Sequence, residues 1–98
     1  MAQTPEGKVK ARVKKTLDEM GIYNFSPFQA GMGRAGIPDI ICCYNGLFVA
    51  IECKAGKGKT TALQDREINA IRTAKGLAFV INEENVDNLK ELLQWNKI

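Results

Sequence analysis

Two acidic residues and a lysine flank a predicted β-hairpin in the middle of the chain. The dipeptide Asn45-Gly46 separates two runs rich in β-branched and aromatic residues, 39–44 and 47–54, and it is the strongest short signal for a two-residue type I′ turn. Counting back along the ladder from that turn places Asp39 directly opposite Glu52, on the same face of the hairpin. Their Cβ atoms should then lie roughly 4.5–5.5 Å apart.

Opposed acids at this distance repel each other unless a positive charge neutralises them. Lys54 lies two residues beyond Glu52 and so shares its face. A divalent cation held by Asp39 and Glu52 would polarise a scissile phosphate and lower the pKa of a bound water molecule. Lys54 would position that water or stabilise developing negative charge. The alternative is an exposed strand end, where Glu52 and Lys54 form an ordinary surface pair. Because opposed acids do not stabilise a hairpin, the pattern favours phosphodiester hydrolysis.

Length and composition narrow the kind of site. The 98 residues correspond to a single domain, residues 1–98. Because the chain has no histidine, His-dependent nucleases, Ser-His-Asp hydrolases and most zinc sites are excluded. A metal held by carboxylate oxygens points to Mg²⁺ or Mn²⁺. The three cysteines do not complete a disulfide framework, so we expect buried, reduced thiols in strands.

The charge of the chain is unevenly distributed. Residues 1–76 carry twelve Lys or Arg and seven Asp or Glu, whereas residues 77–98 carry two and four. A basic body with an acidic end is typical of a surface that binds a polyanion such as DNA. No apolar run reaches the length of a membrane span, and the N-terminus lacks the apolar core of a signal peptide. We therefore expect a cytoplasmic protein with no membrane partner.

A first helix is predicted to begin at Thr4-Pro5, with Thr at the N-cap and Pro at the first helical position. Gly21 is its expected C-terminal end. Glu6 lies within the apolar stripe and should point toward the core side. The stripe comprises Val9, Val13, Leu17 and Met20. Basic residues off the stripe should form an outer surface: Lys8, Arg12, Lys14 and Lys15.

Capping and turn signals predict the remaining elements. A capping box, Thr61-x-x-Gln64, opens a helix that should reach about Lys75, with Gly76 ending it. Its inward residues are expected to be Leu63, Ala70, Ile71 and Ala74. The other elements are a strand at 22–28, a glycine-rich loop at 29–36, a Gly/Lys loop at 55–60, a strand at 77–81 and a final helix, capped by Asn82, up to Trp95. The order α-β-β-β-α-β-α indicates an α/β fold with a mixed sheet flanked by helices.

Two short motifs carry a resemblance to a known nuclease superfamily. Ile37-Pro38-Asp39 followed by Glu52-Cys53-Lys54 resembles the PD-(D/E)XK nuclease signature. The sequence is more closely similar to the VRR-NUC (virus-type replication-repair nuclease) family, and the likeness covers nearly the entire chain. Its elements are an acid on the first helix, Glu6, the G-I-P-D motif at 36–39, the I-E-C-K motif at 51–54 and a glutamine on the next helix, Gln64. The resemblance implies a restriction-endonuclease-like α-β-β-β-α-β core.

The resemblance also implies a metal site, a catalytic lysine and a substrate. The metal ligands would be Asp39, Glu52 and the backbone carbonyl of Cys53, with Mg²⁺ or Mn²⁺ as the metal. Lys54 would be catalytic. Stand-alone members are short, phage-borne proteins that resemble homodimeric junction resolvases. A homodimeric endodeoxyribonuclease acting on branched DNA, such as Holliday junctions or flaps, is therefore what the resemblance implies.

Two further residues receive supporting roles from the resemblance. Glu6 would lie near the metal's water shell and contact the metal through a water molecule. Gln64 would stand near Lys54 or the phosphate. For Glu6 the alternative is a favourable acid at a helix N-terminus, and for Gln64 it is membership of the capping box alone.

Basic residues outside the motifs are candidate DNA contacts. Arg34 lies in the glycine-rich loop and should be free to touch the DNA backbone. Lys57 and Lys59 either contact phosphates or are simply solvated. Because no recognition helix or base-reading module is visible, specificity should come from backbone shape and dimer geometry. The full set of candidate contacts is Lys8, Arg12, Lys15, Arg34, Lys57 and Lys59.

Two other functions compete with a nuclease. A non-catalytic DNA- or partner-binding domain with a nuclease-like fold would have no need of opposed acids. Nucleotide binding is suggested by Gly58-Lys59-Thr60, which follows a strand and precedes a helix, but Cys53 stands where the full phosphate-loop pattern needs a glycine. The G-x-G-x-x-G match at 31–36 leads into a strand rather than a helix. We therefore expect no nucleotide cofactor.

Overall fold

The computed structural model describes residues 3–27 and 34–95. Its elements are α1 (Pro5–Glu19), β1 (Tyr23–Phe25), β2 (Ile40–Tyr44), β3 (Leu47–Cys53), α2 (Ala62–Thr73), β4 (Leu77–Ile81), the 3-10 helix η1 (Val86–Asn88) and α3 (Leu89–Trp95). The strands form one sheet in the order β1-β2-β3-β4, in which β4 is parallel to β3 and the other neighbours are antiparallel. The predicted α/β class, element order and mixed sheet are confirmed.

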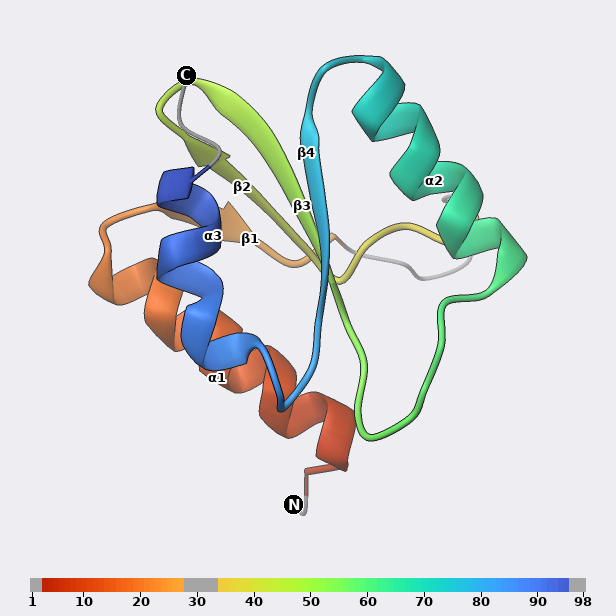
Figure 1. Ribbon diagram of the computed structural model, residues 1–98, viewed down its shortest axis with the longest axis horizontal. Helices are drawn as coiled ribbons and strands as arrows, with labels where there is room; N and C mark the ends of the chain where they lie inside the picture. The colour runs from red at the N-terminus through yellow and green to blue at the C-terminus, as the bar shows by residue number, and fades with distance from the viewer. Residues whose placement is uncertain (1–2, 28–33, 96–98) are drawn as a thin grey trace.

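Helices cover both faces of the sheet. Figure 1 shows α1 and α3 together on one face and α2 on the other. Side chains alternate along a strand, so β2 sends Ile40 and Cys42 toward α1 and α3, and Ile41 toward α2. The buried core under α1 and α3 comprises Val9, Val13, Leu17, Ile22, Ile40, Cys42, Val49, Ile51, Cys53, Ile81, Val86, Leu89 and Leu93. The buried core under α2 comprises Ala50, Ile68 and Ala78.

The first helix forms as its sequence signals predict. The Thr4 side chain accepts a hydrogen bond from the Gly7 backbone N–H at 3.0 Å, which satisfies a donor that the first turn leaves free. Gly21 follows the C-cap with φ +71°, a left-handed conformation that glycine adopts without steric cost. Three stripe residues are buried, namely Val9, Val13 and Leu17.

The central hairpin has the predicted turn and register. Asn45 and Gly46 have φ values of +52° and +81°, as a type I′ turn requires. The ladder runs from Tyr44↔Leu47 to Ile40↔Ile51. Asp39 lies in a bend one residue before β2, so the expectation that it belongs to the strand was wrong. A bend follows the buried Pro38, whose ring cannot donate a ladder hydrogen bond.

The rotation of α2 about its axis differs from the prediction. Leu63, Ala70 and Ala74 are exposed, while Glu67 and Ile68 are buried and Ile71 is half-buried. The apolar pattern alone favoured the small alanines as inward residues. In the structure, Gln64 and Glu67 make polar contacts on the sheet side of the helix, and Ile68 on the same side packs with Ala50 and Ala78. Leu63 is thereby left 45% exposed.

The end of α2 uses glycine for a reason other than the predicted one. The left-handed residue is Lys75, with φ +75°, and Gly76 does not have a positive φ. A Cβ on Gly76 would lie 2.9 Å from Ile71 Cγ2 and 3.2 Å from Phe48 O. Gly76 is therefore needed for close packing between the end of α2 and β3.

Two other boundaries and one thiol also differ from the predictions. The first strand spans only Tyr23–Phe25, and residues 28–33 of the expected strand and loop lie outside the described residues. Asn82 does not cap α3: its Oδ1 accepts from the Glu84 backbone N–H in the turn before η1, whose N-cap residue is Asn85. Cys42 and Cys53 are buried, as expected, but Cys43 is exposed. Within the described ranges, no helix is long and apolar enough to cross a membrane.

Candidate active site

Asp39 and Glu52 come together at the end of the hairpin, as the register predicts. The last ladder pair, Ile40↔Ile51, places these two residues one step further along the neighbouring chains. Asp39 Oδ2 accepts a hydrogen bond from the Cys53 backbone N–H at 2.8 Å. A bend and this hydrogen bond therefore hold Asp39 against the end of β3, in place of the predicted strand pairing.

Glu52 is a buried acid in an environment that opposes its ionisation. Only 3% of the residue is exposed. Burial, and then the charge of Asp39, raise the pKa of Glu52 to about 7, although the Lys54 ammonium acts to lower it. A Glu with this pKa ionises readily only when a cation offsets the cost of burial and repulsion.

The two carboxylate oxygens of Glu52 have different surroundings. Oε2 accepts from Gln64 Nε2 at 2.9 Å and lies 3.6 Å from Lys54 Nζ. Oε1 is buried and has no hydrogen-bond partner among the described residues. A buried acceptor without a partner is costly, and a cation at Oε1 would remove that cost.

Lys54 is positioned by the strand on its other side. Its backbone N–H donates to the Ile81 carbonyl of β4 at 2.9 Å, and only 12% of its side chain is exposed. The ammonium therefore lies beside the Glu52 carboxylate on the face that the hairpin register predicts. A half-buried ammonium next to the Glu52 carboxylate can balance part of its charge.

Gln64 combines the two roles that its position in the sequence left open. Its Oε1 accepts from the Thr61 backbone N–H at 2.9 Å, and its own backbone N–H donates to Thr61 Oγ1 at 3.2 Å, which completes the predicted capping box. Its Nε2 remains free to donate to Glu52. The capping box thus fixes the rotamer of a side chain that in turn orients the carboxylate of Glu52.

Glu6 is exposed, so the prediction that it points toward the core was wrong. It lies in the first turn of α1, before the first buried residue, Val9. Its charge nonetheless contributes, after burial and Asp39, to the raised pKa of Glu52. Glu6 therefore acts on Glu52 through its charge, and none of the described contacts joins it to the two acids.

The donor set has the composition that Mg²⁺ or Mn²⁺ prefers. No group of three or more His, Cys, Asp or Glu side chains within residues 3–27 and 34–95 could hold a metal ion. Mg²⁺ usually binds one or two carboxylates and takes its other ligands from water and substrate phosphate. Asp39 and Glu52 provide such a pair, and the unpartnered Oε1 of Glu52 offers an oxygen for it.

Of the predicted DNA contacts, the two arginines form ion pairs with acids and the lysines are exposed. Arg34 donates to Glu67 Oε2 from Nε at 3.2 Å and from Nη2 at 2.9 Å, so the expectation that it is free was wrong. Arg12 pairs with Asp87. The lysines of this set are exposed, namely Lys8, Lys15, Lys57 and Lys59.

Two acids that were not predicted as site residues make structural contacts near the site. Glu83 accepts from the Gly56 backbone N–H at 2.9 Å and 3.2 Å, which anchors the loop carrying Lys57 and Lys59. Nothing in the local sequence signals this contact. Glu67 pairs with Arg34 and is buried. Its spacing of three residues from Gln64 was a usable signal, because residues three apart share a helix face.

Comparisons with known proteins identify solved structures with the same fold. The chain is similar to a solved structure described as a VRR_NUC domain, with a TM-score of 0.77, 26% identity, and coverage of 91% of this chain and 97% of the other. A second structure, described as a VRR_NUC domain protein, has a TM-score of 0.66 at 22% identity and shares the fold over 97% of this chain and 89% of its own. No family model and no curated protein matches the sequence.

Proposed function

Because this chain is a VRR-NUC domain, we propose that it is a Mg²⁺- or Mn²⁺-dependent endonuclease that hydrolyses phosphodiester bonds in DNA. One observation carries the proposal above the others. Glu52 is buried beside Asp39, and its Oε1 has no partner among the described residues. A domain that only binds DNA gains nothing from this costly arrangement, whereas a nuclease uses it to hold a cation.

The residues around the acids have complementary roles in the proposed reaction. Asp39, Glu52 and the backbone carbonyl of Cys53 would hold the cation, which would supply polarisation of the scissile phosphate and a lower pKa for a bound water molecule. Gln64 Nε2 keeps the Glu52 carboxylate in one orientation. Lys54 Nζ donates hydrogen bonds to the attacking water or to the phosphate oxygens, where negative charge develops.

The substrate in this proposal is branched DNA, such as a four-way junction or a flap. The exposed lysines on α1 and in the 55–60 loop would contact phosphates, which set position without reading sequence. A homodimer is part of the proposal, because two copies can place two active sites across one junction. Exposed aromatic residues offer a surface for it: Tyr23, Phe25 and Phe48. A phage origin and action in the host cytoplasm complete the proposal.

A cleavage assay with one variant and one control tests the proposal. Wild type, Lys54→Ala and Lys90→Ala are incubated with labelled duplex, flap and four-way-junction DNA in Mg²⁺, Mn²⁺ or EDTA. Lys90 is an exposed lysine on α3, on the opposite face of the sheet, so its loss matches the change in charge. We expect metal-dependent cleavage of branched DNA by wild type and Lys90→Ala and none by Lys54→Ala. If wild type cuts nothing in any metal, the protein is a binding domain instead.

A further inference from the structure

The segment that carries Asp39 has no regular secondary structure of its own. Residues 34–39 form a turn at Ala35-Gly36 and a bend at Asp39. A short loop of this kind holds a carboxylate in place only if something outside it fixes the backbone. Asp39 itself is hydrogen-bonded to the end of β3, and the part of the segment before it contacts α2.

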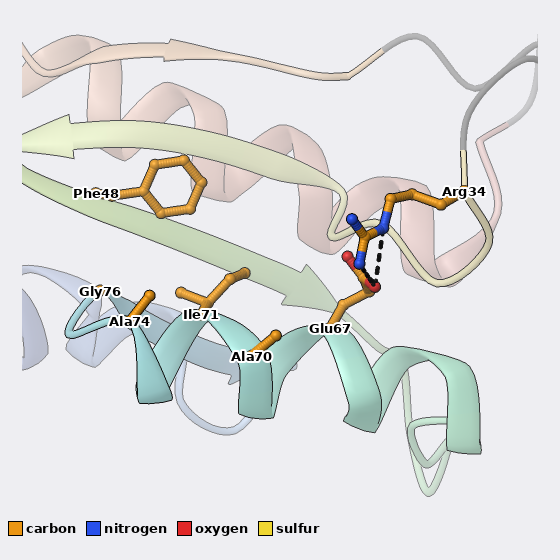
Figure 2. Close-up of a pocket in the computed structure, with 7 residues that line it drawn as sticks. All are labelled: Arg34, Phe48, Glu67, Ala70, Ile71, Ala74 and Gly76. Atoms are coloured by element: carbon orange, nitrogen blue, oxygen red, sulfur yellow. Dashed lines mark hydrogen bonds and ion pairs between the residues drawn. The ribbon is translucent and has the colours of Figure 1, made fainter.

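Three contacts dock this segment onto α2. Arg34 reaches from the loop to Glu67, with Nη2 2.9 Å from Oε2 (Figure 2). Arg66 Nη2 donates to the Ala35 carbonyl at 3.5 Å. Gly36 has φ +84°, and a Cβ there would lie 2.4 Å from the Leu63 carbonyl oxygen, so only glycine allows this approach. The loop thus rests directly on the first two turns of the helix.

Glu67 is an unfavourable choice if the position serves stability alone. Only 9% of its side chain is exposed, whereas 66% of the Arg34 side chain is. Removing a carboxylate from water is costly, and an apolar residue of similar volume in its place is often neutral or stabilising. Glu67 lines an open pocket of about 290 Å³ with Phe48, Ala70 and Ile71, where an apolar side chain would fit.

One helix therefore contacts one of the two acids and the loop that leads to the other. Gln64 contacts Glu52 directly, and Glu67, three residues later on the same face, contacts the loop that leads to Asp39. We propose that Glu67 is a positioning residue, which through Arg34 locks residues 34–39 against α2 so that Asp39 meets Glu52 in the geometry that a divalent cation needs. This inference rests on the proposed function for its consequence, and on the contacts of Arg34 and Gly36 for its geometry.

The position of Asp39 can be measured without metal or DNA. The Cys53 backbone N–H donates to Asp39 Oδ2, so its hydrogen exchange reports whether Asp39 is in place. We expect Glu67→Met to speed exchange of the Cys53 amide at least about fivefold, with no loss of melting temperature, because the buried charge is removed. Glu67→Gln, which keeps an acceptor for Arg34, should have an intermediate effect. Glu19→Gln, a matched loss of charge at the far end of α1, should have none.

Metal binding and kinetics give the second readout. Loss of a group that supports a metal ligand typically costs about 10–100-fold in metal affinity or activity, so Glu67→Met should weaken Mn²⁺ binding, measured by calorimetry without DNA, by at least about tenfold. The kcat should fall with little change in KM for DNA. Arg34→Gln should reproduce both effects, and the double variant should be no worse than either single one.

Each contrary result has a definite meaning. Unchanged exchange of Cys53 in Glu67→Met overturns the inference, as does a melting temperature that falls while Mn²⁺ affinity stays the same. Independent, multiplying effects of Arg34→Gln and Glu67→Met also overturn it. A wild type that neither binds Mn²⁺ nor cuts DNA overturns the proposed function instead, and the exchange of Cys53 still decides whether Glu67 positions Asp39.

Discussion

The two faces of the sheet are built on different principles. On the face covered by α1 and α3, thirteen apolar residues of the described chain are buried in one continuous core. On the α2 face, the buried apolar residues among those described are only Ala50, Ile68 and Ala78. The same face holds both buried charged residues of the described chain, Glu52 and Glu67.

This contrast separates stability from function. Apolar burial stabilises a fold in proportion to the area removed from water, whereas a buried carboxylate costs free energy unless it is paired. The α1/α3 face therefore stabilises the domain. On the α2 face, the burial of acids lowers the free energy of unfolding but holds the acids close together. Variants on the α1/α3 face should therefore mainly lower the free energy of unfolding, whereas variants of the acids on the α2 face should mainly lower cleavage.

The largest effect is expected from Asp39→Asn on the α2 face. Asparagine still offers an oxygen to the Cys53 backbone N–H, so the fold should persist, but the loss of charge removes half of the carboxylate pair. Cleavage should fall at least about 100-fold, the upper end of the loss caused by disturbing a group that merely supports a metal ligand. Gel assays with Mn²⁺ and thermal melting measure the two quantities. Glu91→Gln, an exposed acid on α3, is the control and should keep full cleavage.

The next effect is on stability and belongs to the α1/α3 face. Leu17 is fully buried, so Leu17→Ala should lower the free energy of unfolding by about 2–5 kcal/mol. Ile71 on α2 is half-buried, and Ile71→Ala should cost roughly half as much or less. Urea unfolding measures both values. If both variants lost the same free energy of unfolding, the α1/α3 face would not be the main source of stability.

A pH dependence distinguishes the buried acid from the apolar core. Glu52 loses its proton near its ordinary pKa of 4.5 when unfolded but only at about 7 when folded. The folded state therefore binds more protons between these values, and the stability of the metal-free protein should fall as pH rises from 4.5 to 7, then level off. The total fall in the free energy of unfolding is on the order of 3 kcal/mol.

Glu52→Gln should remove this fall, since the amide is neutral at every pH. The variant should match wild type near pH 4 and exceed it in stability above pH 7, as urea unfolding in EDTA would show. Mn²⁺ should raise the stability of wild type above pH 7 and leave that of the variant unchanged. A wild-type stability that rises between pH 4.5 and 7 would contradict the raised pKa of Glu52.

The smallest effect concerns the exposed lysines beside the site. Lys59 is exposed in the 55–60 loop, and a lysine that contacts a phosphate contributes about one to the slope of log affinity against log salt concentration. Lys59→Ala should lower the magnitude of that slope by about one for junction DNA. Arg12→Ala should lower it less, because Arg12 is already paired with Asp87. Titrations by fluorescence anisotropy at several salt concentrations measure the slopes.

Local signals were sufficient for much of the fold and for the central acids. The Asn45-Gly46 turn determines the register, and because side chains alternate with a strict period of two, the register determines that Glu52 and Asp39 meet. The capping box of Thr61 and Gln64 likewise needs only four consecutive residues. Such features are readable in a sequence because all the interacting groups are close along the chain.

Only the tertiary structure decided how α2 is rotated and which acids it buries. A helical pattern fixes which residues share a face, but the choice of face depends on partners far along the chain, here Glu52 for Gln64 and Arg34 for Glu67. On this face Ile68 also packs with Ala50 and Ala78, whereas Leu63 and two alanines are exposed. The anchoring of Gly56 by Glu83 was decided in the same way, across 27 residues. Contacts of this range leave no periodic trace in the sequence, because they depend on how separate elements pack together.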